Sequence, residues 1–434
     1  MKRIACRTLT AAAAALAGCS ADDAIPVLPP SLAACPAYVT VPASCYRGEG
    51  SSGAAYMIVM PEHWNRTLYL FNRGATPVPF DSARSLGAGR FLLADSVAVA
   101  ASAYRSATPL ARDAAEDTED LRRIFVRAFG QPRRTVVHGL SFGGLVTARC
   151  AELYRGFDGA FAGCGLVAGA LPSYYPLLDL RLVYQYYCRN LPRPEERQYD
   201  LFLGVDPQGA MTAAEVRSRI NECTGIDLPA AQRSAEQRQN LANIVSVARI
   251  QESALVANMD AATVLLRILI QDVLGGRNPL KTMGVRYSGS TDDDALNNGV
   301  ARYAANAQAA ATFSSADNPT GKVSIPVVTL HAIDDSRAFV ENEAAYRQTF
   351  QRAGTLGLLY QAYTNQGGHC LFTAAESLAM LEVLLKWIDT RTPPTSQDVL
   401  SACDRYRTEL GGACRFNATY QPAPLETRMY ARQP

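Results

Sequence analysis

Short apolar runs alternate with amphipathic stretches in the first and last thirds of this 434-residue sequence. Each run has the length of a buried strand. Between two of them, residues 114–129 place Leu121, Ile124, Phe125 and Ala128 at three- and four-residue steps, which is the spacing of a helix. This alternation indicates an α/β protein. The expected strands cover residues 54–60, 67–71, 96–101, 134–138, 159–167, 325–330 and 358–363.

The middle of the chain has a different pattern, which is mostly helical over about 150 residues before Ile325. Thr212 and Glu215 match a capping box at the start of one of these helices. We expect a helical cap inserted at the carboxyl ends of the strands, where it would exclude water from a site beneath it. A separate domain with its own role is the alternative. The expected helices cover residues 178–189, 230–247, 252–273 and 297–311, and one further helix starts at Ala213.

A second capping box, Thr373 and Glu376, predicts a helix that ends near Asp389. The tail from Thr392 contains several prolines, and we expect it to lie extended against the surface. Four divisions follow from these patterns. The first part of the core covers residues 35–170, the cap 171–321, the second part of the core 322–390 and a C-terminal extension 391–434.

The first residues are typical of a targeting segment. Lys2, Arg3 and Arg7 precede an alanine-rich apolar run that ends in Leu-Ala-Gly-Cys at Cys19. This start resembles a bacterial lipoprotein signal over residues 1–18, which implies a lipidated Cys19 and a tether over 19–34. Cleavage near Ala17 without a lipid is the alternative. The resemblance implies a protein that is exported and lipid-anchored in the bacterial cell envelope, on the periplasmic face or in the outer membrane.

Charge and hydropathy narrow the possible partners. The net charge is +2, and removal of the three basic residues of the targeting segment leaves −1. The sequence contains no cluster of basic residues of the kind that binds nucleic acid. We expect no later run to span a bilayer, because charged residues interrupt the most apolar candidate, residues 263–274. Membrane contact is therefore expected through the lipid anchor alone, and the oligomeric state stays open.

Nine cysteines remain once Cys6 and Cys19 are set aside. In an oxidising compartment they are candidates for disulfides, although the sequence does not fix their connectivity. Proximity in the sequence favours the pairs Cys35–Cys45, Cys188–Cys223 and Cys403–Cys414. An odd number leaves at least one thiol unpaired or paired between chains. No spacing is that of a zinc site.

Gly139-Leu140-Ser141-Phe142-Gly143 lies between a predicted strand and the helical pattern of residues 144–153. A serine flanked by glycines at a strand-to-helix turn is typical of a nucleophile elbow. The tight turn requires small neighbours and exposes the hydroxyl at the end of the strand. Ser141 is therefore the candidate nucleophile.

A serine hydroxyl needs a base and an acid that orients the base. The chain has four histidines, and three of them have less suitable positions: His63 lies far upstream, His138 directly precedes the elbow and His331 closes an apolar run. His369 lies in a glycine-containing loop after the strand predicted at 358–363, so we expect it to be the base. Asp334 and Asp335 follow the preceding strand and are the candidates for the acid.

The order serine, aspartate, histidine is that of the α/β-hydrolase superfamily, which this chain resembles over roughly residues 55–170 and 322–390. The segment from His331 to Asp335 looks like the His-Gly-x-x-Asp turn of that family, with Ala332 in place of the glycine. The match implies Asp335 as the acid, with Asp334 as the alternative. It also implies a mostly parallel, doubly wound sheet with an inserted helical cap.

An oxyanion hole needs two N–H donors. One is expected to be the amide of Phe142. By the resemblance, the other comes from the loop after the strand at 67–71, where many relatives have His-Gly and this chain has Arg73 and Gly74. The second donor is therefore either Gly74 or Ala75. Arg73 is expected to make a structural salt bridge, with an anionic substrate group as its alternative partner.

Cys370 follows the predicted base and allows a comparison with tannase-type and feruloyl esterases. Those enzymes join a cysteine before the nucleophile to one after the histidine. Here Leu140 precedes Ser141, so that disulfide is absent and the comparison argues against that branch. Cys370 is expected to bond elsewhere or to pack as a small apolar residue.

Together these residues predict a serine hydrolase that cleaves carboxylic esters, small or oligomeric, and that needs no metal or organic cofactor. One alternative is an aminopeptidase-like serine peptidase, which would need cap carboxylates to bind an amine. Asp292, Asp293 and Asp294 are the clustered candidates for that role. A lipid-tethered binding protein without activity is the other alternative.

Overall fold

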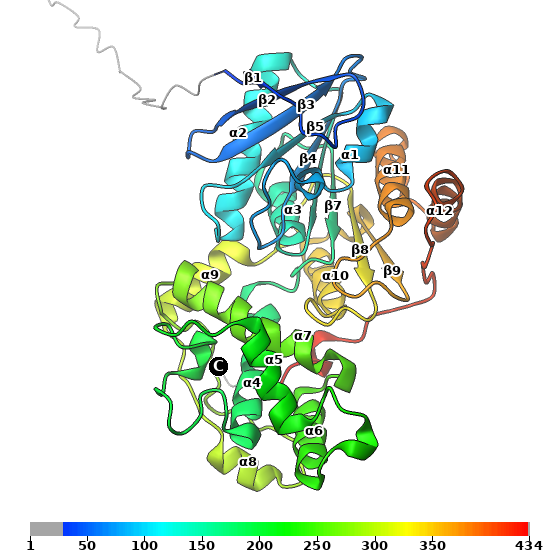
Figure 1. The fold of residues 1–434 in the computed structure, drawn as a ribbon. Coiled ribbons are helices and arrows are strands. Elements are labelled where there is room, and N and C mark those ends of the chain that lie inside the picture. Colours follow the sequence, from blue (N-terminus) through cyan, green and yellow to red (C-terminus); the bar gives the residue numbers. More distant parts are fainter. Residues whose placement is uncertain (1–28, 433–434) are drawn as a thin grey trace, which may run out of the picture.

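The computed structural model describes residues 29–432, and one lobe of it is built on a nine-stranded sheet (Figure 1). The first three strands and β5 pair antiparallel, and from β5 to β9 all neighbours are parallel. In spatial order the strands are β1 (Ser31–Ala33), β2 (Ala43–Glu49), β3 (Ala55–Pro61), β5 (Ala98–Ser102), β4 (Thr67–Asn72), β6 (Arg134–Leu140), β7 (Gly159–Gly163), β8 (Val327–Ala332) and β9 (Leu359–Thr364).

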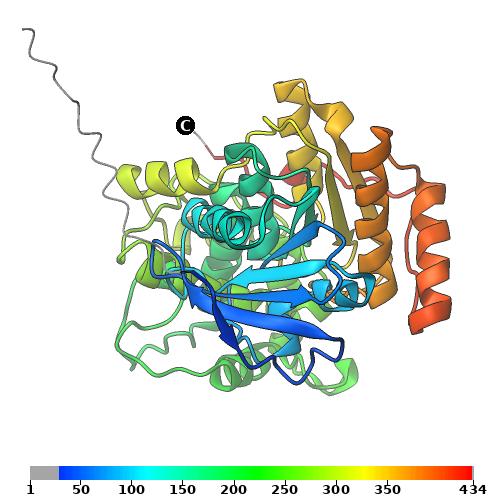
Figure 2. The same cartoon turned by 90° about the horizontal axis from the view of Figure 1, so that it is seen from above.

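Helices cover both faces of this sheet, because side chains that alternate along each strand point to opposite faces. In β4, Leu68 and Leu70 pack on one side, and Tyr69 and Phe71 pack on the other. Figure 2 shows the two layers of helices. The first layer contains α2 (Ala111–Phe129), α3 (Phe142–Leu153) and α10 (Asn342–Ala353); the second contains α1 (Gly89–Leu92), α11 (Ala374–Thr390) and, outside it, α12 (Ser396–Leu410).

The strand order reverses between β4 and β6. The chain passes from β4 outward to β5 and then returns across β4 to form β6 on its other side. The loops that follow β4 and β6 therefore diverge at the same edge of the sheet, which is where α/β sheets hold their ligands. This topology brings the loop after Asn72 beside the turn that contains Ser141.

The second lobe is the helical insertion between β7 and β8, and it has its own hydrophobic cluster (Figure 1). Tyr430 from the C-terminal tail packs into that cluster. The lobe contains α4 (Ala170–Cys188), α5 (Ala213–Thr224), α6 (Ala235–Ala248), α7 (Leu255–Asp260), two π-helical segments (Ala261–Leu265 and Ile268–Val273), α8 (Asp293–Gly299) and α9 (Ala307–Asp317). Short 3-10 turns within residues 29–432 are Ala83–Leu86, Leu93–Asp95, Leu201–Leu203, Ala230–Gln232, Glu252–Ala254, Leu356–Leu358 and Leu425–Thr427.

The predicted fold class, a mostly parallel sheet with an inserted helical cap, is confirmed, and so are both capping boxes. Two predictions about elements were wrong. The helix expected at 297–311 is broken, because Val300 is extended and the Tyr303 backbone bonds with Thr282 before Asn306 caps α9. The tail expected to be extended forms α12, which starts with its own capping box at Thr395.

Three further differences concern the ends of elements and the membrane. The strand expected at 159–167 stops at Gly163, because Cys164 has a positive φ of 45°. Residues 31–33, expected in the tether, form β1. Within residues 29–432, one helical stretch, Glu252–Val273, is long and apolar enough to cross a membrane, contrary to our expectation, and half of its apolar window is buried in the protein.

Four disulfides join the described cysteines. The three predicted pairs are confirmed: Cys35–Cys45, Cys188–Cys223 and Cys403–Cys414. The fourth, Cys164–Cys370, was not predicted, and Cys150 is a free, buried cysteine. Four disulfides fit an extracellular protein. The predicted signal segment and the lipidation site at Cys19 lie outside the described residues.

Candidate active site

Ser141 lies at the turn from β6 into α3. Its backbone conformation (φ 59°, ψ −124°) is one that residues other than glycine rarely adopt. The surrounding glycines allow this turn. A Cβ atom on Gly139 would lie 2.1 Å from the carbonyl oxygen of Gly143, and one on Gly143 would lie 2.1 Å from that of Asn72. The hydroxyl is thereby held at the carboxyl edge of the sheet, as the elbow motif predicts.

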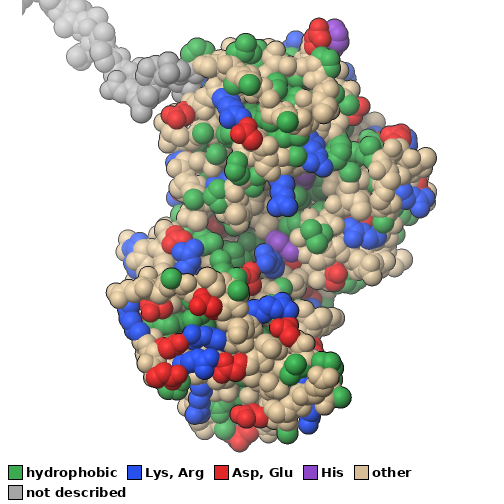
Figure 3. Space-filling model, in the orientation of Figure 1, with side chains coloured by type: hydrophobic (Ala, Val, Ile, Leu, Met, Phe, Trp, Pro, Cys, Tyr) green, Lys and Arg blue, Asp and Glu red, His purple; other side chains and the backbone are tan. Residues whose placement is uncertain are grey.

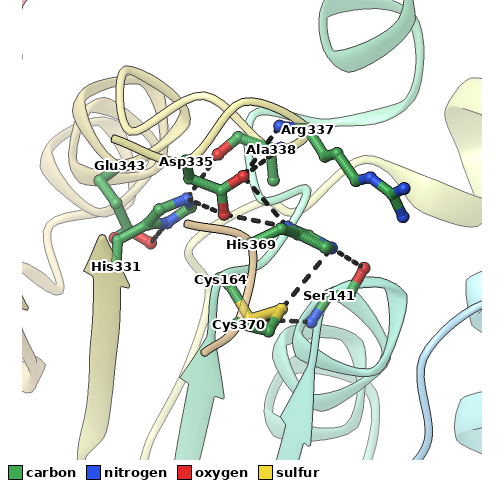
Figure 4. The surroundings of a disulfide bond; sticks show 9 residues. All are labelled: Ser141, Cys164, His331, Asp335, Arg337, Ala338, Glu343, His369 and Cys370. Carbon is green, nitrogen blue, oxygen red and sulfur yellow. Dashed lines mark hydrogen bonds and ion pairs between the residues drawn. A yellow bond between two sulfur atoms is a disulfide. The ribbon is translucent and has the colours of Figure 1, made fainter. Parts of the chain in front are cut away.

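His369 and Asp335 come to this hydroxyl from loops more than 190 residues further along the chain (Figure 4). The Nε2 atom of His369 lies 2.9 Å from the Oγ atom of Ser141. Its Nδ1 atom lies 2.9 Å from Oδ2 and 3.1 Å from Oδ1 of Asp335. Asp334 instead accepts a hydrogen bond from the Gly368 amide. The structure thus brings Ser141, His369 and Asp335 together and places Asp334 beside the loop that carries the histidine.

The chain has the α/β-hydrolase fold. No protein-family model matches the sequence. A curated o-phthalyl amidase from Xanthobacter agilis is 33% identical over 102 residues, which is 23% of this chain and 22% of the amidase. The chain therefore matches about a fifth of that relative's length.

Solved structures share the fold at low sequence identity. Feruloyl esterase B from Aspergillus oryzae is 13% identical, with a TM-score of 0.47 over 85% of this chain and 86% of that one. Candida antarctica lipase A is 13% identical, with a TM-score of 0.41 over 88% and 90% of the two chains. Pyrococcus horikoshii acylaminoacyl peptidase is 10% identical, with a TM-score of 0.37 over 83% of this chain and 50% of that one.

The predicted oxyanion residues surround the hydroxyl. Phe142 is the first residue of α3, so its amide lies at the helix N-terminus directly after Ser141. A Cβ atom on Gly74 would lie 3.7 Å from the Cβ atom of Ser141, and Ala75 lines the same cavity as Ser141. The loop after β4 therefore reaches Ser141, with both Gly74 and Ala75 close to it.

Arg73 organises this loop from within. Its buried guanidinium donates to the carbonyl oxygens of Gly74 and, across the loop, Ala103. The hydroxyl of Tyr104 donates to the carbonyl oxygen of Arg73 itself. A trans peptide holds its N–H opposite its C=O, so these bonds fix the directions of the Gly74 and Ala75 amides. The salt bridge expected for Arg73 is wrong, because its partners are backbone carbonyls.

Asp335 also faces a second imidazole. The Nε2 atom of His331 lies 2.6 Å from the Ala338 carbonyl oxygen and 3.5 Å from Oδ2 of Asp335. Its Nδ1 atom lies 3.0 Å from Oε1 of Glu343 on α10. Burial alone would lower the pKa of His331, but the hydrogen bonds and charges of Asp335 and Glu343 outweigh burial and raise this pKa to about 10.

Asp335 keeps its charge in this buried position. Burial alone would raise the pKa of its carboxyl, but hydrogen bonds and charges from His331 and His369 lower it to about 2. The amides of Arg337 and Ala338 donate to Oδ1 at 2.9 and 3.0 Å (Figure 4). The carboxylate is therefore ionised and fixed in one orientation, as needed to hold the tautomer of an adjacent histidine.

The disulfide Cys164–Cys370 lies beside both Ser141 and His369, the predicted nucleophile and base. The sulfur of Cys164 lies 3.4 Å from the Ser141 amide nitrogen, and that of Cys370 lies 3.6 Å from Nε2 of His369. Its Cα atoms are 5.5 Å apart, although 206 residues separate them in the sequence. Cys370 thus bonds to the end of β7 instead of to the elbow.

A cavity of about 540 Å³ opens over Ser141 and His369. Figure 3 shows this face hollowed between the two lobes, with a histidine side chain in the hollow. Leu265 of the helical insertion lines the cavity from one side, and Arg337 lines it while donating to Asp260 of the insertion at 2.8 Å. The insertion therefore forms part of the wall around the hydroxyl.

The other residues that the sequence analysis considered have structural roles. Asp292 caps α8 by accepting from the Ala295 amide, and Asp293 accepts from Ser290, so this cluster is a solvated helix start. His138 is buried beneath the elbow and stacks on Phe161, and burial lowers its pKa to about 3. Among the described residues, no group of three or more His, Cys, Asp or Glu side chains is placed to hold a metal ion.

Removal of the Cys164–Cys370 disulfide should lower activity by releasing the loop that carries His369. For the double variant Cys164→Ser/Cys370→Ser we expect kcat for 4-nitrophenyl esters to fall about 10- to 100-fold, because small displacements of a positioned base have effects of that size. The matched control is Cys403→Ser/Cys414→Ser, which removes the disulfide between α12 and its following loop and should leave kcat unchanged. Equal losses in both variants would contradict the positioning role.

Substitution of Arg73 should disturb the loop after β4, which carries Gly74 and Ala75, the predicted candidates for the second oxyanion donor. Arg73→Met removes the donor that fixes the Gly74 carbonyl, and we expect kcat to fall about 10- to 100-fold with little change in KM. The exposed Arg66, whose guanidinium donates to the Gln131 carbonyl oxygen and lies over the Trp64 ring, supplies the control Arg66→Met, because it does not line the cavity. A change confined to KM, or none at all in a protein with an unaltered circular dichroism spectrum, would show that the loop does not depend on Arg73.

The charge of His331 should appear in the pH dependence of stability. The pKa of His331 is raised from 6.5 to about 10 on folding, so the folded protein binds more protons than the unfolded chain between these values. The free energy of unfolding should fall as pH rises through this range, by up to about 1.4 kcal/mol per pH unit. Denaturant titrations of wild type and His331→Gln test this: the variant should lose the slope, and equal slopes would refute the assignment.

Proposed function

We propose that this protein is a serine hydrolase that cleaves carboxylic esters through an acyl-enzyme on Ser141. One observation carries the proposal. The hydroxyl of Ser141 lies within hydrogen-bond distance of Nε2 of His369, while Nδ1 of the same ring faces the buried carboxylate of Asp335. A hydroxyl, an imidazole and a carboxylate in this order can transfer a proton during acyl transfer.

In this reaction the oxygen of Ser141 attacks the ester carbonyl as Nε2 of His369 takes the hydroxyl proton. Asp335 stabilises the imidazolium that forms and keeps its ring oriented. The amide of Phe142, with that of Gly74 or Ala75, donates to the oxyanion. His369 then gives the proton to the leaving alkoxide. Water, activated by the same histidine, releases the acid and restores Ser141.

The shape and charge of the cavity support an esterase over an aminopeptidase. A free amine needs a carboxylate partner, and none of the residues that line the cavity is Asp or Glu. The candidates Asp292 and Asp294 are exposed at α8. Asp317 lines a small neighbouring pocket, and burial raises its pKa to about 7, which weakens it as an anion at neutral pH.

The acyl-enzyme chemistry also extends to amides. The curated relative from Xanthobacter agilis is by name an o-phthalyl amidase, so an o-phthalyl amide belongs in the substrate panel. The proposal further treats residues 171–321 as the cap, residues 1–18 as a signal segment and Cys19 as the lipid anchor of an exported protein.

Labelling with a fluorophosphonate probe tests the nucleophile. Wild type should be labelled, and Ser141→Ala should lose both labelling and ester hydrolysis. His369→Ala should lose most of its turnover. Asp335→Asn should lower kcat by about 10³- to 10⁴-fold, because an amide favours the wrong tautomer of the histidine.

Asp334→Asn is the matched control for the acid. Its side chain accepts one bond from the Gly368 amide, which an asparagine oxygen can also accept, so activity should change little. Labelling that persists in Ser141→Ala, or a larger loss in Asp334→Asn than in Asp335→Asn, would overturn these assignments.

A further inference from the structure

We propose that the substrate of this site carries a carboxylate, which Arg84 and Arg90 bind on the wall of the catalytic cavity. The inference rests on the proposed function, since it names the class of ester that the Ser141 site would accept. It adds two residues outside the nucleophile, the base, the acid and the oxyanion loop.

The charge of the cavity wall is the first argument. Its charged side chains are all arginines: Arg73, Arg84, Arg90 and Arg337. Two of these are occupied, because Arg73 donates to carbonyls inside the loop and Arg337 is paired with Asp260. The two remaining guanidinium groups belong to the wall of the same cavity of about 540 Å³ as Ser141. With a Debye length of about 8 Å at physiological ionic strength, their attraction for an anion in contact with this wall is only partly screened.

Arg84 and Arg90 are exposed and make no ion pair within residues 29–432. Both come from one short segment, the 3-10 turn Ala83–Leu86 followed by α1. Guanidinium groups bind carboxylates through two parallel hydrogen bonds, which gives geometric specificity as well as charge. The segment thus offers unoccupied donors to the cavity in which Ser141 lies.

This segment is anchored to the sheet, which distinguishes it from a loose surface loop. Ser85 and Leu86 are buried, and the Ser85 hydroxyl lies 3.0 Å from that of Tyr38. A Cβ atom on Gly87 would lie 2.3 Å from the ring of Phe71, and one on Gly89 would lie 2.4 Å from the ring of Tyr69. The backbone that carries the two arginines is therefore packed directly on aromatic side chains of β4.

The cavity also has an apolar part for the body of such a substrate. Phe71, Phe91, Leu140 and Phe372 line it together with the arginines, and the Arg90 guanidinium lies 4.6 Å from the centre of the Phe91 ring. Its volume suits a small ester. A carboxylate attached to a short chain or ring would place its apolar atoms on these side chains and its charge at the arginines.

Two pairs of esters test the inference. The first pair has the same leaving group and differs at the end of the acyl chain: 4-nitrophenyl hexanoate and the mono-4-nitrophenyl ester of adipic acid. The second pair carries the charge in the leaving group: the hexanoate esters of methyl 4-hydroxybenzoate and of 4-hydroxybenzoate. We expect kcat/KM to be higher for the anionic ester than for its neutral partner in at least one pair, and this preference to shrink at high salt.

The variants Arg84→Gln, Arg90→Gln and their combination then locate the binding site. Each single variant should raise KM for the preferred anionic ester about 3- to 10-fold, the size of a partly exposed ion pair. The double variant should remove most of the preference. KM for the neutral ester and the rate of fluorophosphonate labelling should change much less than KM for the anionic ester, because neither neutral reagent forms an ion pair with a guanidinium. The control is Arg352→Gln, an exposed arginine of α10 that does not line the cavity and alters the net charge equally.

The outcomes separate this inference from the proposed function. Neutral esters cleaved by wild type and not by Ser141→Ala, with no preference for either anionic ester, would overturn the inference and leave the esterase standing. A preference that survives in Arg84→Gln/Arg90→Gln would also overturn it. Failure of both neutral and anionic esters, together with absence of labelling, would reject the proposed function itself.

Discussion

The charge of one buried carboxylate, that of Asp335, organises this site. A carboxylate removed from water is costly unless hydrogen bonds and opposite charge compensate it. Here two backbone amides donate to Oδ1, and an imidazole lies on each side, His369 toward the cavity and His331 toward the sheet. Each of these partners comes from a segment whose position depends on the sheet, so the acid is fixed only in the folded protein.

The same dependence extends outward from Asp335. Glu343 on α10 accepts from Thr329 and Gln361, on neighbouring strands, while it faces His331. The position of His331, which faces the Asp335 carboxylate, thus depends on the packing of α10 on the sheet. On the nucleophile side, the close approach of Gly143 to Asn72 ties the elbow to β4. The proposed chemistry uses few side chains, but those side chains depend on contacts that involve β4, β6, β8 and β9.

Much of this arrangement was predictable from the sequence, because short motifs mark the residues around Ser141 and Asp335. The glycines around Ser141 predict a sharp turn. The choice of Asp335 over Asp334 came from the resemblance of residues 331–335 to the His-Gly-x-x-Asp turn of the α/β-hydrolase superfamily. The fourth disulfide was missed because its cysteines lie 206 residues apart. Cys164 also lies inside the strand predicted at 159–167, and only the structure ends that strand at Gly163 and so brings Cys164 to the carboxyl edge of the sheet beside Cys370.

Other features needed the tertiary structure. In the sequence, His331 is the last residue of an apolar run. Its two acidic partners, Glu343 and Asp335, are evident only in the structure. The helix α12 was hidden by the prolines before it, although Thr395 and Asp398 form a capping box. Arg84 and Arg90 have no motif, since what distinguishes them is the cavity they share with Ser141. Their importance depends on where distant segments meet.

The most direct test of the central claim is detection of the acyl group on Ser141. A slowly deacylated ester would be mixed with the enzyme, quenched in acid within the first turnovers and examined by mass spectrometry of the intact protein and its peptides. The account predicts one acyl adduct per chain, on the peptide containing Ser141, and its loss in His369→Ala. Hydrolysis of the ester with no adduct, or with the adduct on another residue, would contradict it.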